Sequence, residues 1–419
     1  MCLVVNRDCF NYISIIGRGG FSKVWKVEYK NTKVYFALKE ISKVKILDCK
    51  NLKSVKNERE LLSKLNHPFI VNLHFSFQNV NYLYLVMDLF TGGDLRYHLF
   101  HKNYFEENQT KFFISCILLG LEYCHTNLII HRDIKPENII LDSNGYSHIT
   151  DFGIALQQSK HTTHSSGTPT YMAPEALFGK IQTTVSDYYS LGVLTYELMF
   201  GVKPYSGKNR EEIKEKVNKY EMDLNIIKTY KNKCSKDLID FINKLMKKDP
   251  NKRLGNLGGV TDIKKHSWLI NINWKELYNF QLKAPFIPTG EKNYEVNFVS
   301  RKIKFGEDTE QRYDAIIKSA EYKTAFNDYL YFNRYDINTH GLKINFFNIH
   351  DKIYKIRKLP RNNSGDNLKK NNKNMVVNIP PEKTNVKRSI SPTGERSSKA
   401  FNEANKFINR RKNFKVKYL

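Results

Sequence analysis

The order of apolar and polar residues predicts a strand-rich first part of the chain. Residues 34–39 show the alternation that is typical of strands, and the apolar-rich runs 12–16, 70–77 and 82–87 also predict strands. Between the runs 34–39 and 70–77, apolar residues recur three and four positions apart and predict a helix over residues 54–65. His67-Pro68 ends this helix, because proline cannot continue the hydrogen-bond ladder.

The second part of the chain has the apolar spacing of helices. A long helix is predicted over residues 107–126, and Asp187 opens a second, strongly apolar one. Between them, short apolar runs predict strands over residues 128–130, 139–141 and 147–150, the last two joined by a turn. Polar residues follow the first and third strands directly. We therefore expect their side chains to project from loops on a rigid hairpin.

Composition changes this picture mainly at the carboxyl end. The chain has 419 residues, 41% of them hydrophobic, which predicts a globular protein of two or three domains or lobes. Its net charge is +26, and residues 351–419 hold 19 Lys and Arg against 5 Asp and Glu. From about residue 362 the chain is polar and aperiodic, which predicts disorder. The basic run 405–417 fits an acidic membrane surface or nucleic acid as partner, and equally a solvated tail with no specific partner.

The cysteines and the lack of long apolar runs indicate an intracellular chain. We expect free thiols in a reducing compartment, because no C-x-x-C or pairing rhythm is present among Cys2, Cys9, Cys49, Cys116, Cys124 and Cys234. The sequence has no signal peptide and no run able to cross a bilayer. The expected location is the cytoplasm, with the nucleus as alternative.

Two motifs supply the groups that phosphoryl transfer needs. Residues 131–138 read H-R-D-I-K-P-E-N, and residues 151–153 read D-F-G. In this chemistry a carboxylate accepts the proton of the substrate hydroxyl, a cation stabilises the moving phosphoryl group, and two side chains hold the metal. We predict that Asp133 is the base, that Lys135 is the cation, and that Asn138 and Asp151 bind Mg²⁺, with Mn²⁺ as a substitute.

Upstream of these motifs, the chain offers a nucleotide site. A glycine-rich turn follows the first strand and lets backbone N–H groups approach phosphates, although Ser22 stands where a third glycine is usual. The predicted ATP-binding residues of this loop are Ile16, Gly17, Arg18, Gly19, Gly20, Phe21, Ser22, Lys23 and Val24. The others are Ala37, Lys39, Glu58, Met87, Asp88, Phe90, Asp94 and Ile140. Lys39 ends a strand, and its partner is Glu58 or, as alternative, Glu60.

Three further residues have predicted structural roles. Glu175 ends an A-P-E triplet and needs a buried cation, for which Arg253 is the candidate. Asp187 is expected to fix the backbone of the catalytic loop, or to act as the N-cap of the helix that it opens, and the two roles are compatible.

Taken together, these motifs resemble eukaryotic protein kinases over residues 10–270. H-P-F at 67–69, G-G-D at 92–94, H-I-T-D-F at 148–152 and D-I-K-K-H at 262–266 resemble the AGC group, and among those kinases the YANK-type serine/threonine kinases most. The resemblance implies a bilobal α+β kinase fold and a monomer that transfers the γ-phosphoryl group of ATP to serine or threonine of protein substrates. It also implies that Thr168, in the G-T-P-T stretch, belongs to the catalytic residues. Glu137 and Asp94 favour basic substrates.

The resemblance also divides the chain into segments. We expect an extension at 1–9, an amino lobe at 10–87, a hinge at 88–93 and a carboxy lobe at 94–270. An AGC-like extension at 271–340, a junction at 341–361 and a basic tail at 362–419 follow. The aromatic motif at 329–334, with Tyr329 and Phe332, is expected to pack into a groove of the amino lobe and brace the helix that carries Glu58. The alternative is an amphipathic helix over residues 325–332 that caps the core.

The sequence departs from the family pattern in its regulatory positions. His164 stands where AGC kinases commonly have a phosphorylatable threonine, which leaves Thr163 and Ser165 as candidates and Arg132 as the partner of a phosphate. Met1 is followed by Cys2, so the myristoylation glycine of several YANK-type kinases is absent. A pseudokinase scaffold is the rival hypothesis, but no catalytic group is missing.

Overall fold

The computed structural model describes residues 5–157, 166–220, 234–289 and 307–332. All of these belong to the first of two compact units, residues 1–348. The second unit, residues 349–419, lies outside the described residues, and so do Cys2, Thr163, His164 and Ser165.

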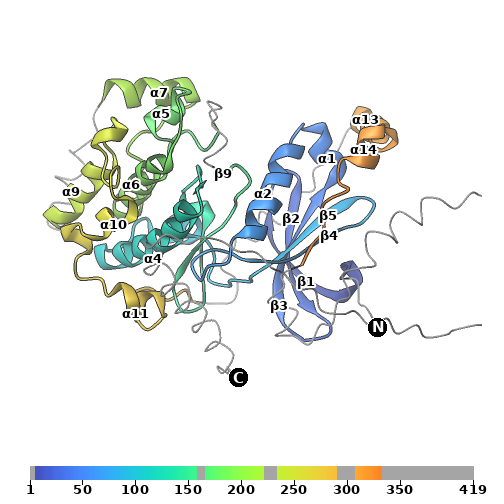
Figure 1. Ribbon diagram of the computed structural model, residues 1–419, viewed down its shortest axis with the longest axis horizontal. Coiled ribbons are helices and arrows are strands. Elements are labelled where there is room, and N and C mark those ends of the chain that lie inside the picture. The colour runs from blue at the N-terminus through green and yellow to red at the C-terminus, as the bar shows by residue number, and fades with distance from the viewer. Residues whose placement is uncertain (1–4, 158–165, 221–233, 290–306, 333–419) are drawn as a thin grey trace, which may run out of the picture. The chain divides into compact units, whose positions relative to one another are not determined.

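The amino lobe is built on an antiparallel sheet with the strand order β1-β2-β3-β5-β4-β10 (Figure 1). Its strands are β1 (Phe10–Arg18), β2 (Ser22–Tyr29), β3 (Tyr35–Ser42), β4 (Leu73–Gln78), β5 (Tyr82–Met87) and β10 (Tyr331–Phe332). Alternation along β5 separates two cores: Leu83 and Leu85 face one cluster, and Tyr84 and Val86 face the other. The register of β2 on β3 places Val24 opposite Lys39.

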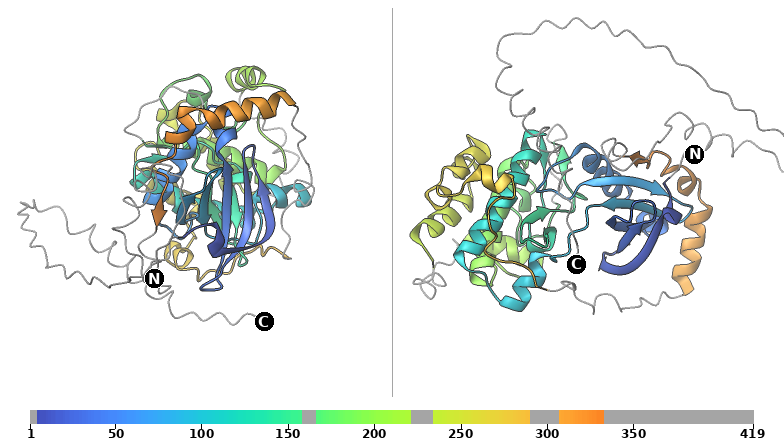
Figure 2. Two further views of the ribbon diagram at one scale, coloured as in Figure 1. Left: turned by 90° about the vertical axis from the view of Figure 1, so that its right-hand side faces the viewer. Right: turned by 90° about the horizontal axis from the view of Figure 1, so that it is seen from below.

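In the part of the chain that the structure describes, the helices beside this sheet are α1 (Lys43–Asp48), α2 (Leu52–Lys64), α13 (Glu307–Lys318) and α14 (Ala320–Thr324). Helix α2 buries Val55, Leu61 and Leu62 against the sheet, together with Glu58. Helix α13 packs against α1, as the orange and blue ribbons show (Figures 1 and 2), and Arg312 forms a 2.8 Å ion pair with Asp48 at the end of α1. A segment far along the chain therefore completes the amino lobe.

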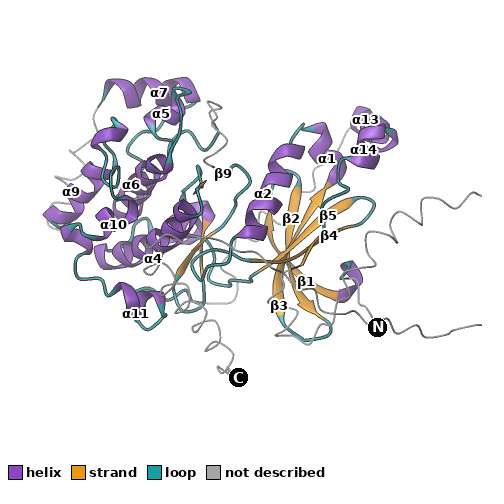
Figure 3. Ribbon diagram, in the orientation of Figure 1, coloured by secondary structure: helices purple, strands orange, loops and turns teal. Residues whose placement is uncertain are grey.

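The carboxy lobe is mainly helical (Figure 3). Its helices are α3 (Leu95–Lys102), α4 (Glu107–Thr126), α5 (Pro174–Leu177), α6 (Thr184–Phe200), α7 (Arg210–Lys219), α9 (Lys236–Leu245), α10 (Gly259–Lys264) and α11 (Trp274–Tyr278). Short 3-10 helices lie at η1 (Arg7–Cys9, in the amino lobe), η2 (Pro136–Asn138), η3 (Pro250–Lys252) and η4 (Ser267–Leu269). Every residue from 185 to 200 is buried, so α6 is the centre of this lobe. Gly201 ends α6 at φ +70°, and a Cβ there would lie 2.1 Å from the carbonyl oxygen of Asn103.

Two small sheets carry the loops between the lobes: β6 (Ile129–Ile130) with β9 (Leu156–Gln157), and β7 (Ile139–Leu141) with β8 (Ser147–Ile149). The hinge is tied to β7, because Gly92 N donates to Leu141 O and Leu141 N donates to Gly93 O, at 2.9 and 2.8 Å. A Cβ at Gly92 would lie 2.5 Å from Leu141 O, so only glycine fits. This contact sets the hinge beside the hairpin that carries the polar motifs.

The bilobal α+β fold is confirmed, and most expected elements are present. The helix over 107–126 has the bounds of α4, and the hairpin is β7–β8. The strand expected over 70–77 starts at Leu73, because Ile70 and Val71 pair instead with the end of β8. The helix over 325–332 is wrong: α14 ends at Thr324, and Tyr331–Phe332 pair with β4. The N-cap role of Asp187 is also wrong, because α6 begins at Thr184 with Thr183 as its cap.

Candidate active site

The carboxylate of Asp133 is the centre of a dense polar cluster. Its Oδ2 lies 2.6 Å from Lys135 Nζ and accepts a 3.0 Å hydrogen bond from Asn138 Nδ2. Its Oδ1 accepts the Thr168 hydroxyl at 2.8 Å and the Thr168 N–H at 3.1 Å. Lys135 Nζ also donates to the Thr168 hydroxyl, at 2.8 Å. The four residues that the sequence predicts as catalytic therefore form one connected group.

Asp187 fixes the backbone of the loop that carries this cluster. Oδ1 of Asp187 accepts the N–H of Arg132 at 2.8 Å, and Oδ2 accepts the N–H of His131 at 2.9 Å. Arg132 has φ +69°, a left-handed conformation that a non-glycine residue keeps only when its surroundings hold it. His125 Nε2 lies 2.8 Å from Oδ2 as well. Although burial opposes ionisation, these donors lower the pKa of Asp187, so the carboxylate stays charged.

On the opposite side, Lys39 of β3 reaches Glu58 of α2. Its Nζ lies 2.6 Å from Glu58 Oε1. Burial disfavours the ammonium, but the carboxylates of Glu58 and Asp151 outweigh it and raise the pKa of Lys39. The alternative partner, Glu60, pairs with Lys64 on its own helix at 2.8 Å. Glu58 is therefore the partner of Lys39, and both line the cavity between the lobes.

Asp151 lies at the far end of the same cavity. Its φ is +64°, and its Oδ1 accepts the N–H of Gly153 at 3.2 Å. Burial raises the pKa of this carboxyl, but Lys39 and the Gly153 N–H more than compensate, and the net pKa is lowered. Phe152 is fully buried, with its ring 4.9 Å from the His131 ring. The positive charge of Lys39 thus helps to keep the Asp151 carboxylate ionised.

The donor set fits a hard divalent cation. Asp151 supplies carboxylate oxygens, and Asn138 uses its Nδ2 toward Asp133, which leaves its amide oxygen available. Mg²⁺ is commonly held by one or two protein groups together with substrate phosphates. Among the described residues, no group of three or more His, Cys, Asp or Glu gathers as a complete protein cage. A metal held jointly with a nucleotide fits this chemistry.

A cavity of about 550 Å³ extends from Lys39, Glu58, Asn138 and Asp151 to the hinge. Its lining does not include the predicted catalytic residues Asp133, Lys135 and Thr168. It is lined by most of the predicted nucleotide residues: Ile16, Gly17, Arg18, Gly19, Ser22, Val24, Ala37, Lys39, Glu58, Met87, Asp88, Phe90, Asp94 and Ile140. Gly20, Phe21 and Lys23 belong to the same loop but do not line it. Burial and the nearby Glu137 raise the pKa of Asp94, which caps α3, to about 6.

Sequence reasoning missed part of the cavity wall. Leu62, Val71 and Thr150 also line it. Val71 and Leu62 had been visible only as apolar positions of a strand and a helix, which are equally typical of core. Thr150 directly precedes Asp151, and that position was the only signal available for it.

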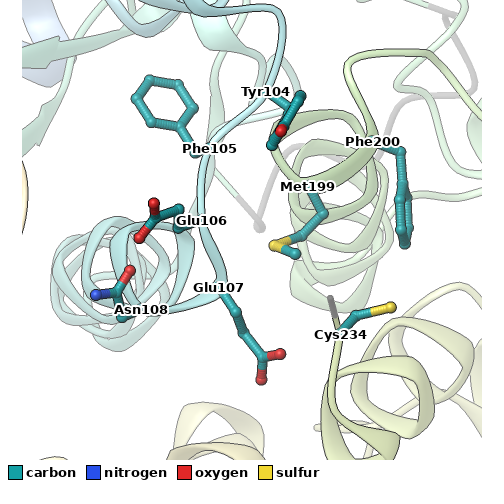
Figure 4. A pocket seen from close by; sticks show the side chains of 8 residues that line it. All are labelled: Tyr104, Phe105, Glu106, Glu107, Asn108, Met199, Phe200 and Cys234. Carbon is teal, nitrogen blue, oxygen red and sulfur yellow. The ribbon is translucent and has the colours of Figure 1, made fainter. Parts of the chain in front are cut away.

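A second cavity, of about 500 Å³, lies in the carboxy lobe (Figure 4). Its lining comes from the start of α4, the end of α6 and Cys234. Glu107 is already engaged there, because its carboxylate accepts Ser235 N at 2.7 Å and Trp268 Nε1 at 2.9 Å. No predicted catalytic or nucleotide-binding residue lines this cavity, so the chemistry belongs to the first one.

The predicted buried ion pair of the carboxy lobe is present. Arg253 Nη1 lies 2.7 Å from Glu175 Oε1, and Arg253 is only 2% exposed. Ser186 donates to the same oxygen at 2.8 Å. Burial opposes the charge of Glu175, but Arg253 lowers its pKa below the usual range. The triplet that ends at Glu175 is thereby anchored to α6 and to the segment after η3.

The aromatic motif after α14 packs where the family resemblance predicted, on the amino lobe. Tyr329 is 2% exposed, and its carbonyl accepts Ser76 Oγ at 2.9 Å. Arg59, the neighbour of Glu58 on α2, donates to Asp328 O and lies with its guanidinium 5.9 Å from the centroid of the Tyr329 ring. The backbone of Phe332 pairs with Phe75 of β4. This segment therefore contacts the helix that positions Glu58.

Comparison with known proteins agrees with this geometry. The family model described as protein kinase domain matches residues 10–269, and the chain belongs to this family. It is 38% identical over 298 residues to the serine/threonine-protein kinase sgk-1 of Caenorhabditis elegans, covering 70% of this chain and 63% of that protein. It is 37% identical over 283 residues to Sgk1 of Homo sapiens (67% and 64%) and 36% identical over 288 residues to AtPK1/AtPK6 of Arabidopsis thaliana (68% and 60%). The matched segment thus spans about six tenths of each of these relatives.

Proposed function

We propose that this protein is a serine/threonine protein kinase that transfers the γ-phosphoryl group of ATP to serine or threonine of protein substrates in intracellular signalling. The observation that carries the proposal is the connected group of Asp133, Lys135, Asn138 and Thr168. Through Asn138, this group borders the cavity that the Lys39–Glu58 pair also lines. The serine/threonine class is supported by the three relatives named above, which are all serine/threonine-protein kinases. The finer likeness to YANK-type kinases rests on the sequence motifs.

In the proposed mechanism each side chain has one task. Asp133 orients the acceptor hydroxyl and takes its proton, and Lys135 stabilises the charge of the moving phosphoryl group. Lys39, held by Glu58, positions the α- and β-phosphates. Asn138 and Asp151 would hold Mg²⁺, or Mn²⁺ in its place. The bound metal ion would neutralise charge on the phosphate oxygens. The Thr168 hydroxyl bridges Asp133 and Lys135 and holds the two side chains in position for the acceptor hydroxyl.

Regulation is proposed at two places. The Nη1 of Arg132 is buried without a hydrogen-bond partner among the described residues, while Nε donates to Ile154 O at 2.8 Å. A phosphate on Thr163 or Ser165 would supply the missing acceptor. Tyr329 and Phe332 belong to the segment that packs on the amino lobe, and we propose that this segment biases α2 toward the position that pairs Glu58 with Lys39.

We further propose that the chain is divided into an extension at 1–9, the lobes and hinge within 10–270, an AGC-like extension at 271–340, a junction at 341–361 and a basic tail at 362–419. Among the described residues, no helix has the length and apolar character to span a membrane. We propose a cytoplasmic or nuclear monomer whose basic tail meets an acidic membrane surface or nucleic acid. We also propose, from Glu137 and Asp94, a preference for basic substrates. The Glu137 carboxylate is exposed, although Arg96 contacts it at 2.9 Å.

The decisive experiment measures transfer from Mg-ATP to serine, threonine and tyrosine peptides. We expect the parent to modify serine or threonine peptides, and Asp133→Asn to lose at least about a hundredfold in kcat because the base is removed. Asp314→Asn, an exposed aspartate of α13, is the matched control and should retain parental activity. Equal activity of the parent and Asp133→Asn would refute the mechanism, and a parent that binds ATP without transfer would favour a scaffold.

A further inference from the structure

The segment that follows Asp151-Phe152-Gly153 is held by side chains rather than by a strand ladder. Three successive carbonyl oxygens accept hydrogen bonds: Gly153 O from Ser54 Oγ at 2.6 Å, Ile154 O from Arg132 Nε at 2.8 Å, and Ala155 O from Asn57 Nδ2 at 2.7 Å. Strand β9 begins only at Leu156. The position of this segment therefore depends on donors that lie far away in the sequence.

Two of these donors belong to α2 and lie on the helix face that also carries Glu58. Asn57 and Glu58 follow Ser54 by three and four residues, which places their side chains on the same side of the helix as Ser54. Glu58 holds Lys39 at 2.6 Å, and the other two hold the backbone next to Asp151. The same helix face thus contacts the phosphate-binding lysine on one side and the metal-binding segment on the other.

The contacts are close and partly buried. All three residues of the α2 face are buried or half-buried. A Cβ at Gly153 would lie 3.1 Å from Asp151 Oδ1 and 3.5 Å from Ser54 Oγ, so the segment passes near the helix with little spare room. If the helix moved away, Gly153 O and Ala155 O would lose their partners, and buried carbonyls without partners are costly. The two sides of the site are therefore linked energetically.

We propose that Ser54 and Asn57 are positioning residues that fix the Lys39–Glu58 pair relative to Asp151. This inference rests on the proposed kinase activity. Neither side chain lines the cavity, and both contact the backbone of residues 153–155. Their removal should lower kcat, because Lys39 and Asp151 would no longer be held together, and leave the KM for the peptide unchanged, because the acceptor groove is not involved.

The test compares variants of the full chain. Ser54→Ala and Asn57→Ala each remove one donor, and Ser54→Thr is a conservative variant that keeps a hydroxyl at this position. Ser63→Ala is the matched control, because Ser63 lies on the same helix but donates to Glu60 O of that helix. We measure kcat, the KM values for peptide and ATP, the Mg²⁺ concentration for half-maximal activity, and Tm.

Each alanine variant should lower kcat about five-fold, since a hydrogen bond contributes about 1 kcal/mol and 1.36 kcal/mol corresponds to a tenfold rate change. It should also raise the Mg²⁺ requirement. Ser54→Thr and Ser63→Ala should stay within about two-fold of the parent. A double variant with parental kcat and Mg²⁺ dependence would overturn the proposal. So would a loss of kcat in Ser63→Ala equal to that in Ser54→Ala, or a loss explained by unfolding at the assay temperature.

A second measurement separates this inference from the proposed function. Amide hydrogen exchange over residues 52–58 and 153–157 should be faster in the Ser54→Ala/Asn57→Ala double variant than in the parent, whether or not the protein transfers phosphate. Unchanged exchange in both segments would refute the link even in an active kinase. An inactive parent with the expected change in exchange would instead refute the kinase function and keep the link.

Discussion

The catalytic loop and helix α2 both carry groups of the active site, yet they are held in different ways. The loop rests on Asp187 in α6, a helix whose residues 185–200 are all buried. Helix α2 buries only four of its thirteen residues, Val55, Glu58, Leu61 and Leu62. Side-chain bonds to the Asp151 segment and to the segment after α14 supply further contacts. One half of the site is therefore fixed by a core, and the other by contacts at a surface.

The difference indicates where the activity can be adjusted. A fully buried element moves only when the lobe unfolds, so loss of its contacts lowers the free energy of unfolding. An element held by a few surface contacts can shift while the rest stays folded. Loss of such contacts therefore lowers the fraction of molecules in the active conformation. We therefore expect substitutions under the catalytic loop to affect folding and catalysis together, and substitutions around α2 to affect mainly catalysis.

The largest effect is expected for Asp187→Asn. The amide keeps one oxygen but directs an NH₂ group at the N–H of His131 or Arg132, so a buried donor loses its acceptor. The free energy of unfolding should fall by about 3 kcal/mol, and kcat by about a hundredfold because the loop is displaced. Chemical denaturation and steady-state kinetics measure both. A variant with parental stability and low kcat would contradict the comparison.

A smaller and more selective effect is expected for Tyr329→Ala. It empties a buried site beside Arg59 and should release the segment from α2, lowering kcat about tenfold. Tyr329 also belongs to the hydrophobic core, so Tm should fall, but by less than in Asp187→Asn.

The matched control is Tyr329→Phe. The Tyr329 hydroxyl is buried without a hydrogen-bond partner among the described residues, so its removal should leave kcat at the parental value. Steady-state kinetics on both variants separate the ring from the hydroxyl. Equal losses in the two would show that the hydroxyl, not the packing of the ring, is what matters.

The smallest effect concerns pH and Lys43, which lies under the same segment. Lys43 is 6% exposed, its Nζ donates to Asn79 O at 2.7 Å, and burial lowers its pKa to about 8. Between that value and its ordinary pKa of 10.5, the unfolded chain binds the proton and the folded one does not. The stability of the parent relative to Lys43→Met should therefore rise from pH 8 to pH 10, as measured by Tm. A constant difference would show that Lys43 titrates normally.

The same comparison explains what sequence could and could not predict. The bounds of α4 follow from local periodicity, and the catalytic residues follow from motifs whose spacing is local. The bonds of Ser54 to Gly153 and of Asn57 to Ala155 join residues about a hundred positions apart, and no short pattern marks them. The alternative helix over residues 325–332 is absent for the same reason. The free edge of β4 extends Tyr331 and Phe332 into a strand, and that partner lies some 250 residues earlier.

Strand β10 has a consequence for the solubility of the protein. In the order β1-β2-β3-β5-β4-β10, it covers the edge of β4, whose backbone groups would otherwise face solvent. An exposed strand edge is a template for pairing with another chain and a common origin of aggregation. A chain truncated before Tyr331 should therefore self-associate at β4, and β10 protects the sheet by occupying that edge from within the same molecule.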